Sequence, residues 1–263
     1  MKKIFGFSLT LAMAALLAFN FSSCIKDTCS NDTSYTKWTP IYRTEGELRT
    51  PPQYEAARDL KNPGKIYFYQ NYILVNEQKE GIHIIDNTNP SSPQNIGFIK
   101  IDGNVDMAVK GDVLYADSWM DLLTINISNI RAPRLSNRTQ NAFQNIFQND
   151  AARGWLVDYK QEPVTESIDC NDPRWGGGGW FMEKDVIFLN SSFDNSNARV
   201  SSVANVAGAA RPAGTGGSFA RFTITGNYLY TVDRQNLTSY NISTLENPTR
   251  SAQTQVGWNI ETI

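Results

Sequence analysis

Three segments of this 263-residue chain repeat the same order of short apolar runs and turn residues. The middle segment consists of residues 111–115, residues 121–128 and Pro133. The same pattern occurs 40 residues earlier, where it ends at Pro93, and 115 residues later, where it ends at Pro248. A spacing shared by two apolar runs and a proline indicates one repeated structural unit. This repeat constrains the fold more than any other feature of the sequence.

Each unit is rich in β-branched and aromatic residues and shows no helical period. Residues 66–69, 72–75 and 82–85, for example, read as short strands separated by polar turns. An interval of 40 residues fits four such strands with their turns, which is the size of one propeller blade. We therefore expect an all-β fold within residues 64–263, a partial and open β-propeller of about four four-stranded blades.

The spacing between the second and third units leaves room for a degenerate blade with a long loop insertion, at about residues 160–217. Residues 154–158 and 185–189 are predicted to supply strands of that blade. Residues 259–262 resemble residues 104–107, so a further repeat is expected to begin where the sequence stops. On this interpretation the chain is truncated at its C-terminus.

The N-terminus reads as a targeting segment, with Lys2 and Lys3 before an uncharged apolar run. Small residues immediately before Cys24 resemble the lipobox of bacterial lipoproteins, which implies that residues 1–23 are a signal peptide and that Cys24 is lipidated. Residues 24–63 would then form a tether, a linker and a first edge. The expected location is the bacterial outer membrane, facing the periplasm or the cell surface. An ordinary secretory signal with an incidental cysteine is the alternative.

The strand followed by Asp86–Pro93 or Asn126–Pro133 resembles the repeat of the LVIVD-repeat family. Members of that family are bacterial, mostly extracytoplasmic and similar to β-propellers. The resemblance covers roughly residues 65–263, apart from the insertion. It implies a fold and a location, but no defined reaction and no catalytic residue.

The sequence contains few of the residues that several kinds of site require. A net charge of −2 leaves no basic surplus for a nucleic-acid partner. His83 is the sole histidine and lies in an apolar run, so packing is the favoured role, and neither a metal site nor a cofactor is expected. A calcium ion held by Asp169, Asn171 and Asp172 is less favoured than solvated turn residues. Cys29 and Cys170 are free to pair in an oxidising compartment, and their pairing stays open.

The candidate ligand-binding residues are Arg174, Trp175, Trp180 and Trp119, since tryptophan and arginine recur at binding hot spots. Capping of the core by these indoles is the interpretation favoured over binding. Two functions follow from the pattern as hypotheses. The favoured one is a lipid-anchored binding or scaffold module for a protein or glycan ligand. The other is a propeller-type enzyme, a hydrolase or lyase on glycans, that uses Asp, Glu and Tyr residues from loops.

Overall fold

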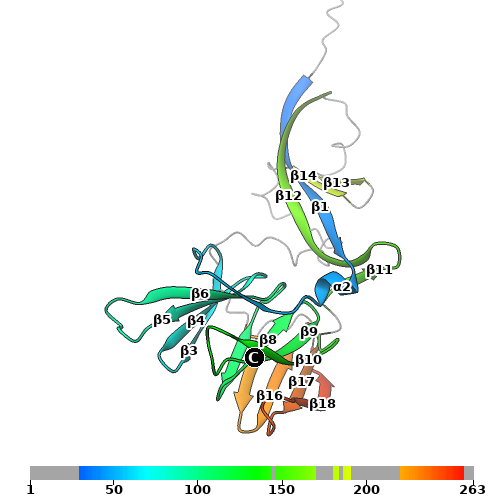
Figure 1. Cartoon of the computed structure of the whole chain (residues 1–263). Helices are drawn as coiled ribbons and strands as arrows, with labels where there is room; N and C mark the ends of the chain where they lie inside the picture. Colours follow the sequence, from blue (N-terminus) through cyan, green and yellow to red (C-terminus); the bar gives the residue numbers. More distant parts are fainter. Residues whose placement is uncertain (1–29, 144–145, 170–179, 184–185, 191–219, 258–263) are drawn as a thin grey trace, which may run out of the picture. The chain divides into compact units, whose positions relative to one another are not determined.

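The computed structural model describes residues 30–143, 146–169, 180–183, 186–190 and 220–257 (Figure 1). The chain divides into two compact units, one of residues 1–39 and 161–199 and the other of residues 40–160 and 200–263. The described residues form strands and one short helix, α2 (Glu45–Leu48), so the predicted all-β class is confirmed. No helix in the described ranges has the length and apolar character needed to cross a bilayer.

Three sheets each contain one copy of the repeat as an antiparallel meander. Sheet 1 consists of β3 (Pro63–Tyr69), β4 (Tyr72–Glu77), β5 (Gly81–Asp86) and β6 (Gln94–Lys100), with β2 (Gln53–Glu55) added beside β6. Sheet 2 consists of β7 (Met107–Lys110), β8 (Val113–Ser118), β9 (Asp121–Asn126) and β10 (Arg134–Thr139). Sheet 3 consists of β15 (Phe222–Thr225), β16 (Tyr228–Val232), β17 (Asn236–Asn241) and β18 (Thr249–Gln255). The three repeated segments are therefore equivalent sheets, as the spacing predicts.

The same turn chemistry ends the third strand of each sheet. The side-chain oxygens of Asp86, Asn126 and Asn241 accept hydrogen bonds from the backbone N–H two residues further on, at 2.9, 3.0 and 2.8 Å. Short polar side chains form such turns because they substitute for a backbone acceptor. The turn that precedes the second strand has Gly111 in sheet 2 and Gly226 in sheet 3, with φ angles of 56° and 54° that favour glycine.

Sheet 2 lies between the other two sheets and has both faces covered. One hydrophobic cluster joins it to sheet 1 and includes Leu74, Ile84 and Leu114. A second cluster joins it to sheet 3 and includes Tyr115 and Tyr240. Every residue of β8 is buried as a result. Alternate side chains of a strand point to opposite faces, so a continuously buried strand requires a neighbour on each side.

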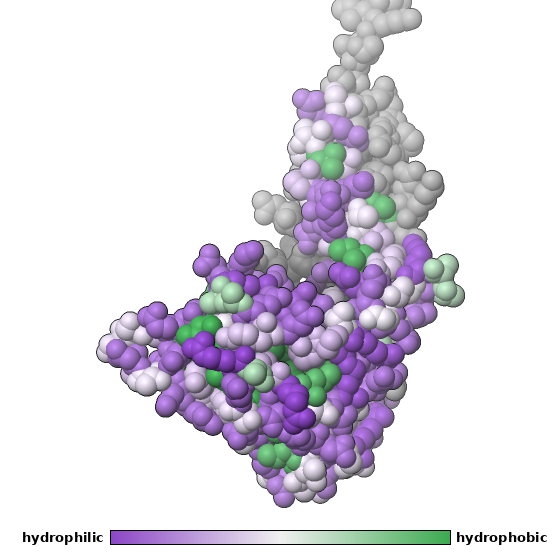
Figure 2. All heavy atoms as spheres, in the orientation of Figure 1, coloured by the Kyte–Doolittle hydropathy of each residue, from purple (hydrophilic) through white to green (hydrophobic). Residues whose placement is uncertain are grey.

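One face of sheet 1 is exposed along β3. Ile66 and Phe68 on β3 point away from sheet 2 and are 58% and 70% exposed. Figure 2 shows hydrophobic atoms reaching the surface over β3–β6 among hydrophilic ones. The four sheets formed by the described residues are open, because none of them closes on itself, which agrees with a partial, propeller-like arrangement.

The fourth sheet differs from the expected four-stranded meander. Its order is β11 (Gln148–Asp150), β12 (Gly154–Asp169), β1 (Ser30–Arg43), β14 (Val186–Asn190) and β13 (Trp180–Glu183). β1 comes from the segment that sequence reasoning treats as tether and linker, and it pairs antiparallel with β14. The two strands expected to belong to a degenerate blade, β12 and β14, are therefore separated by β1 rather than paired with each other.

Candidate functional site

Two buried carboxyl groups lie where the three repeat sheets meet, because β7 approaches both β3 and β15. Asp106 immediately precedes β7, and Asp117 lies near the end of β8. Both residues are 0% exposed. Asp117 Oδ1 accepts hydrogen bonds from the backbone N–H of Val105 and of Asp106, at 2.7 and 3.0 Å. We call Asp106, Asp117 and the two cations that pair with them the acidic node.

The cations of the acidic node come from the two outer sheets. Lys65 of β3 places its Nζ 3.0 Å from Asp106 Oδ1. Arg221, just before β15, places its Nη1 3.3 Å from Asp117 Oδ2. The backbone N–H of Phe222 donates to the second oxygen of Asp106, at 2.8 Å. The node therefore joins all three sheets through charge-assisted contacts.

Burial raises the pKa of Asp106 to about 6, although Lys65 lowers it. Burial also raises the pKa of Asp117, against the opposing effect of Arg221. Raised carboxyl pKa values in a cleft are typical of acid–base catalysis. These two side chains, however, have no exposed surface and line neither of the cavities described below. Their contacts fit a structural role at the centre of the sheets.

Sheet 1 has a related contact made by a glutamate and the histidine. Glu77 occupies the position of Asp117 in the preceding repeat, and its Oε2 accepts from the backbone N–H of Lys61 at 3.0 Å. His83 Nε2 lies 2.9 Å from the same oxygen, and the imidazole packs edge-on against Phe98. His83 is 0% exposed, which agrees with the expected packing role.

An open cavity of about 220 Å³ lies between sheets 1 and 2 at the turns that end their strands. We call it the turn pocket. The β3–β4 turn supplies one wall and the turn after β9 supplies the other. Its lining residues are Tyr69, Gln70, Tyr72, Ile127, Ser128, Asn129, Ile130 and Arg131.

Hydrogen bonds fix the aromatic wall of the turn pocket. The Tyr69 hydroxyl donates to Asp112 Oδ1 at 2.7 Å, and the Gln70 amide donates to the Tyr69 oxygen at 3.0 Å. Burial and the bond to Asp112 raise the pKa of Tyr69, so its hydroxyl stays protonated. The rings of Tyr69 and Tyr72 stack with centroids 6.5 Å apart. This wall is a preformed surface and needs little reordering to bind a ligand.

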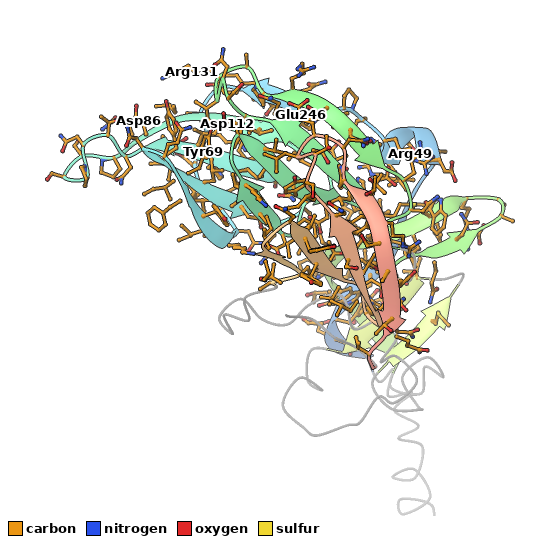
Figure 3. The ribbon with its side chains drawn as sticks, turned by 90° about the horizontal axis from the view of Figure 1, so that it is seen from below. Arg49, Tyr69, Asp86, Asp112, Arg131 and Glu246 are labelled. Atoms are coloured by element: carbon orange, nitrogen blue, oxygen red, sulfur yellow. The ribbon has the colours of Figure 1, made fainter. Side chains whose placement is uncertain are left out.

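The polar wall of the turn pocket carries a positive charge. Arg131 is exposed, and its backbone N–H donates to Asn129 Oδ1 at 3.2 Å. Hydrogen bonds from Thr88 lower the pKa of Asp86, and the charge of Arg131 adds to the effect. Figure 3 shows Asp86, Tyr69, Asp112 and Arg131 at the same end of the sheets. The pocket therefore combines tyrosine side chains and neutral polar groups with the positive charge of Arg131.

A second cavity, of about 190 Å³, is lined mainly by aromatic and apolar side chains. We call it the aromatic pocket. Its lining residues are Glu45, Met120, Asn141, Phe143, Phe147 and Trp155. They belong to α2, the β8–β9 hairpin, the segment after β10, and β12. The two pockets share no lining residue.

Comparison with protein families identifies the first two repeat sheets. The model of the LVIVD repeat matches residues 64–99 and 103–140, which correspond to β3–β6 and β7–β10. The chain contains LVIVD repeats. The recognition made from the turn residues is thereby confirmed for these two segments, and sheet 3 repeats the same meander outside them. No curated protein matches the chain.

Of the residues predicted to bind a ligand, Trp119 lies within the second LVIVD repeat and is 8% exposed. Its indole packs edge-on against Phe147, and its ring occupies the space over Gly103. The structure thus places Trp119 as a core residue of the β8–β9 turn, which agrees with the capping alternative. Arg174 and Trp175 lie outside the described residues, as does Cys24, and Trp180 is described only through its backbone pairing in β13.

The metal hypothesis concerns residues beyond the LVIVD repeats. Within the described ranges, no three His, Cys, Asp or Glu side chains gather as a metal site requires. Asn171, Asp172 and Cys170 are outside those ranges.

Sequence reasoning did not single out the residues of either pocket. Tyr69, Ser128 and Arg131 read as ordinary turn and strand residues of the LVIVD repeats. A signal was nevertheless present, because Arg131 corresponds to Glu246 in the third copy and to Ser91 in the first. The repeat itself therefore does not require one particular charge at this position.

Proposed function

We propose that this protein is a lipid-anchored, extracytoplasmic module that binds a polar ligand, with a saccharide as the best-matched class, in the turn pocket. The observation that carries the proposal is the pocket itself, an open space of about 220 Å³ whose lining includes Tyr69, Tyr72 and the exposed Arg131. Tyrosine rings present an apolar face with a polar edge, which suits the mixed surface of a sugar. Gln70, Ser128 and Asn129 add donors and acceptors for its hydroxyl groups.

Binding is favoured over catalysis by the use that the chain makes of its carboxyl groups. Acid–base catalysis on a glycan requires two carboxyl groups that face each other across accessible space. Asp106 and Asp117 have raised pKa values, yet both are fully buried, and they form ion pairs with Lys65 and Arg221 respectively. The turn pocket has no carboxyl group among its lining residues. A rigid repeat scaffold that presents turns is a common basis for recognition.

The anchor is proposed from the sequence around Cys24, and a direct experiment tests it. The full-length chain and a Cys24→Ser variant are produced in a Gram-negative host and labelled with an alkyne fatty acid. Label on the wild type and none on Cys24→Ser is expected, with the wild type in the detergent phase of a Triton X-114 partition. Equal labelling of the two proteins would overturn the anchor.

The ligand is tested on a glycan array with a peptide array beside it. The variant is Arg131→Gln, which removes the charge from the turn pocket. Arg134→Gln is the matched control, because Arg134 is also exposed, on the next strand, and makes only a long 3.7 Å contact to Glu246. We expect glycan signals that Arg131→Gln loses and Arg134→Gln keeps. Signals confined to peptides would reject the saccharide, and equal effects of the two variants would reject the pocket.

A further inference from the structure

The aromatic pocket is a second site whose chemistry differs from that of the turn pocket. Three of its six lining residues are aromatic, Phe143, Phe147 and Trp155, and Met120 adds a polarisable thioether. Its charged lining residue is Glu45. Aromatic faces carry negative electrostatic potential, so rings grouped around a carboxylate favour a cation with apolar substituents.

Hydrogen bonds hold several of the elements that line this pocket. A capping box in which the Thr44 and Glu47 side chains each bond the other's backbone fixes the start of α2, which carries Glu45. The Phe143 N–H donates to the Met120 carbonyl at 3.0 Å. Trp155 pairs with Asn149 in the β11–β12 ladder. Sites built on such fixed elements bind with a low ordering cost.

The positive charges near the pocket are already engaged. Arg49 donates to Glu45 Oε2 at 2.9 Å and to Asp121 Oδ2 at 3.3 Å. Arg138 donates to the same Asp121 oxygen at 3.1 Å. Neither arginine lines the cavity, and the Glu45 side chain remains 60% exposed. The Glu45 contact to Arg49 uses Oε2, and no protein cation is among the described residues that line the cavity.

We propose that the aromatic pocket binds an alkylammonium group. The volume of about 190 Å³ suits a single such group with its methyl or methylene substituents. The group belongs either to a small quaternary amine or to a lysine side chain on a partner protein, and the recognition chemistry is the same for both. This inference is independent of the saccharide proposed for the turn pocket.

Calorimetric and NMR titrations of the full chain test the proposal with two pairs of probes. Choline is compared with 3,3-dimethyl-1-butanol, its neutral isostere, and a capped Ala-Lys-Ala peptide is compared with Ala-norleucine-Ala. We expect the cation of at least one pair to bind about tenfold more tightly than its neutral counterpart. The pair that shows the preference identifies the source of the amine. Equal binding within both pairs, or no binding by either cation, would overturn the proposal.

Two variants locate the effect. Glu45→Gln should weaken binding of the cation several-fold, whereas Glu80→Gln should leave it unchanged. The control is matched, because Glu80 is 51% exposed and pairs with Arg58 at 2.6 Å, as Glu45 pairs with Arg49. Phe147→Leu should abolish the preference for the cation over its isostere, while circular dichroism confirms the fold. An unchanged preference in both Glu45→Gln and Phe147→Leu would place the amine elsewhere and reject the site.

Discussion

The two faces of sheet 2 meet equivalent neighbours through different chemistry. Toward sheet 1 the buried cluster is almost entirely aliphatic, with Leu74, Ile84 and Leu114 at its centre. Toward sheet 3 the cluster is richer in aromatic residues, and the Tyr115 hydroxyl donates to the Leu245 carbonyl at 2.7 Å. Sheet 2 therefore packs against a similar four-stranded meander on each face, but through mainly aliphatic contacts on one face and more aromatic and polar contacts on the other.

The contacts between turns repeat in register even though their residues differ. Across the first interface Gln70 donates to Asp112, and across the second Lys110, the equivalent of Gln70, donates to Asn227 at 2.9 Å. A second set of positions behaves in the same way, with Asp86 near Arg131 in one interface and Asn126 bonded to Glu246 in the other. The lesson is that the repeat preserves which positions meet, while the residue types at those positions are free to vary.

The open pocket lies at a place where the two interfaces differ in residue type. At the second interface the Leu245 side chain lies close to Gly111. A Cβ added to this glycine would lie only 3.2 Å from Leu245 Cδ1. The position equivalent to Gly111 in sheet 1 is Asn71, and the turn pocket lies beside it, between Tyr72 and Ile130.

The largest expected effect tests the aliphatic interface. Leu114 is 0% exposed, so Leu114→Ala should lower the free energy of unfolding by about 2–5 kcal/mol through lost burial and a residual cavity. Urea denaturation followed by circular dichroism measures it. A loss below about 1 kcal/mol would show that the two sheets do not pack as described.

An intermediate effect tests the acidic node through its pH dependence. The pKa of Asp106, about 6 in the folded protein against an ordinary 3.8, means that the folded state binds a proton that the unfolded chain lacks. The stability from this group therefore increases as pH falls from about 6 to about 4, and is lost as pH rises through 6.

Asp106→Asn replaces the titrating carboxyl group with an amide that does not titrate. From pH 7 to pH 5, the wild type should gain about 1–1.5 kcal/mol of unfolding free energy relative to the variant. Asp59→Asn, at an exposed carboxyl, is the control and should follow the wild type. If the unfolding free energies of Asp106→Asn and the wild type changed with pH in parallel, Asp106 would not take up a proton in the folded protein as proposed.

The smallest effect tests the aromatic interface at the residue next to Leu114. Tyr115→Phe keeps the ring in its cluster and removes the hydrogen bond to Leu245, so we expect a loss of about 0.5–1.5 kcal/mol in the same urea assay. A loss as large as that of Leu114→Ala would mean that the polar contact dominates this face, contrary to the comparison.

The repeat sheets could be predicted from sequence because their determinants are local. Alternating apolar runs specify the strands, and Asp86 or Asn126 specifies the turn two residues ahead. β1 could not be predicted, because residues 30–43 are mostly polar and pair with Val186–Asn190, far away in the sequence. Non-local pairing of this kind leaves no periodic signal in a single strand.

The candidate sites depend on contacts between sheets, which the sequence does not reveal. Asp117 lies in a segment recognisable as a hairpin, yet nothing local indicates that Arg221 reaches it. The turn pocket likewise combines Tyr72 with Arg131, one from each LVIVD repeat. Sequence reasoning named three tryptophans and Arg174 as candidate binding residues instead, and one of them, Trp119, lies in the core.

The central claim is that equivalent positions of successive repeats meet across both interfaces of sheet 2, and cysteine cross-linking tests it most directly. In a chain with Cys24, Cys29 and Cys170 replaced by serine, the pairs Asp86→Cys with Arg131→Cys and Asn126→Cys with Glu246→Cys are treated with a short bis-maleimide and analysed by mass spectrometry. We predict intramolecular links in both pairs and none in the control pair, Asp86→Cys with Glu246→Cys. A link in the control pair, or none in either equivalent pair, would contradict the account.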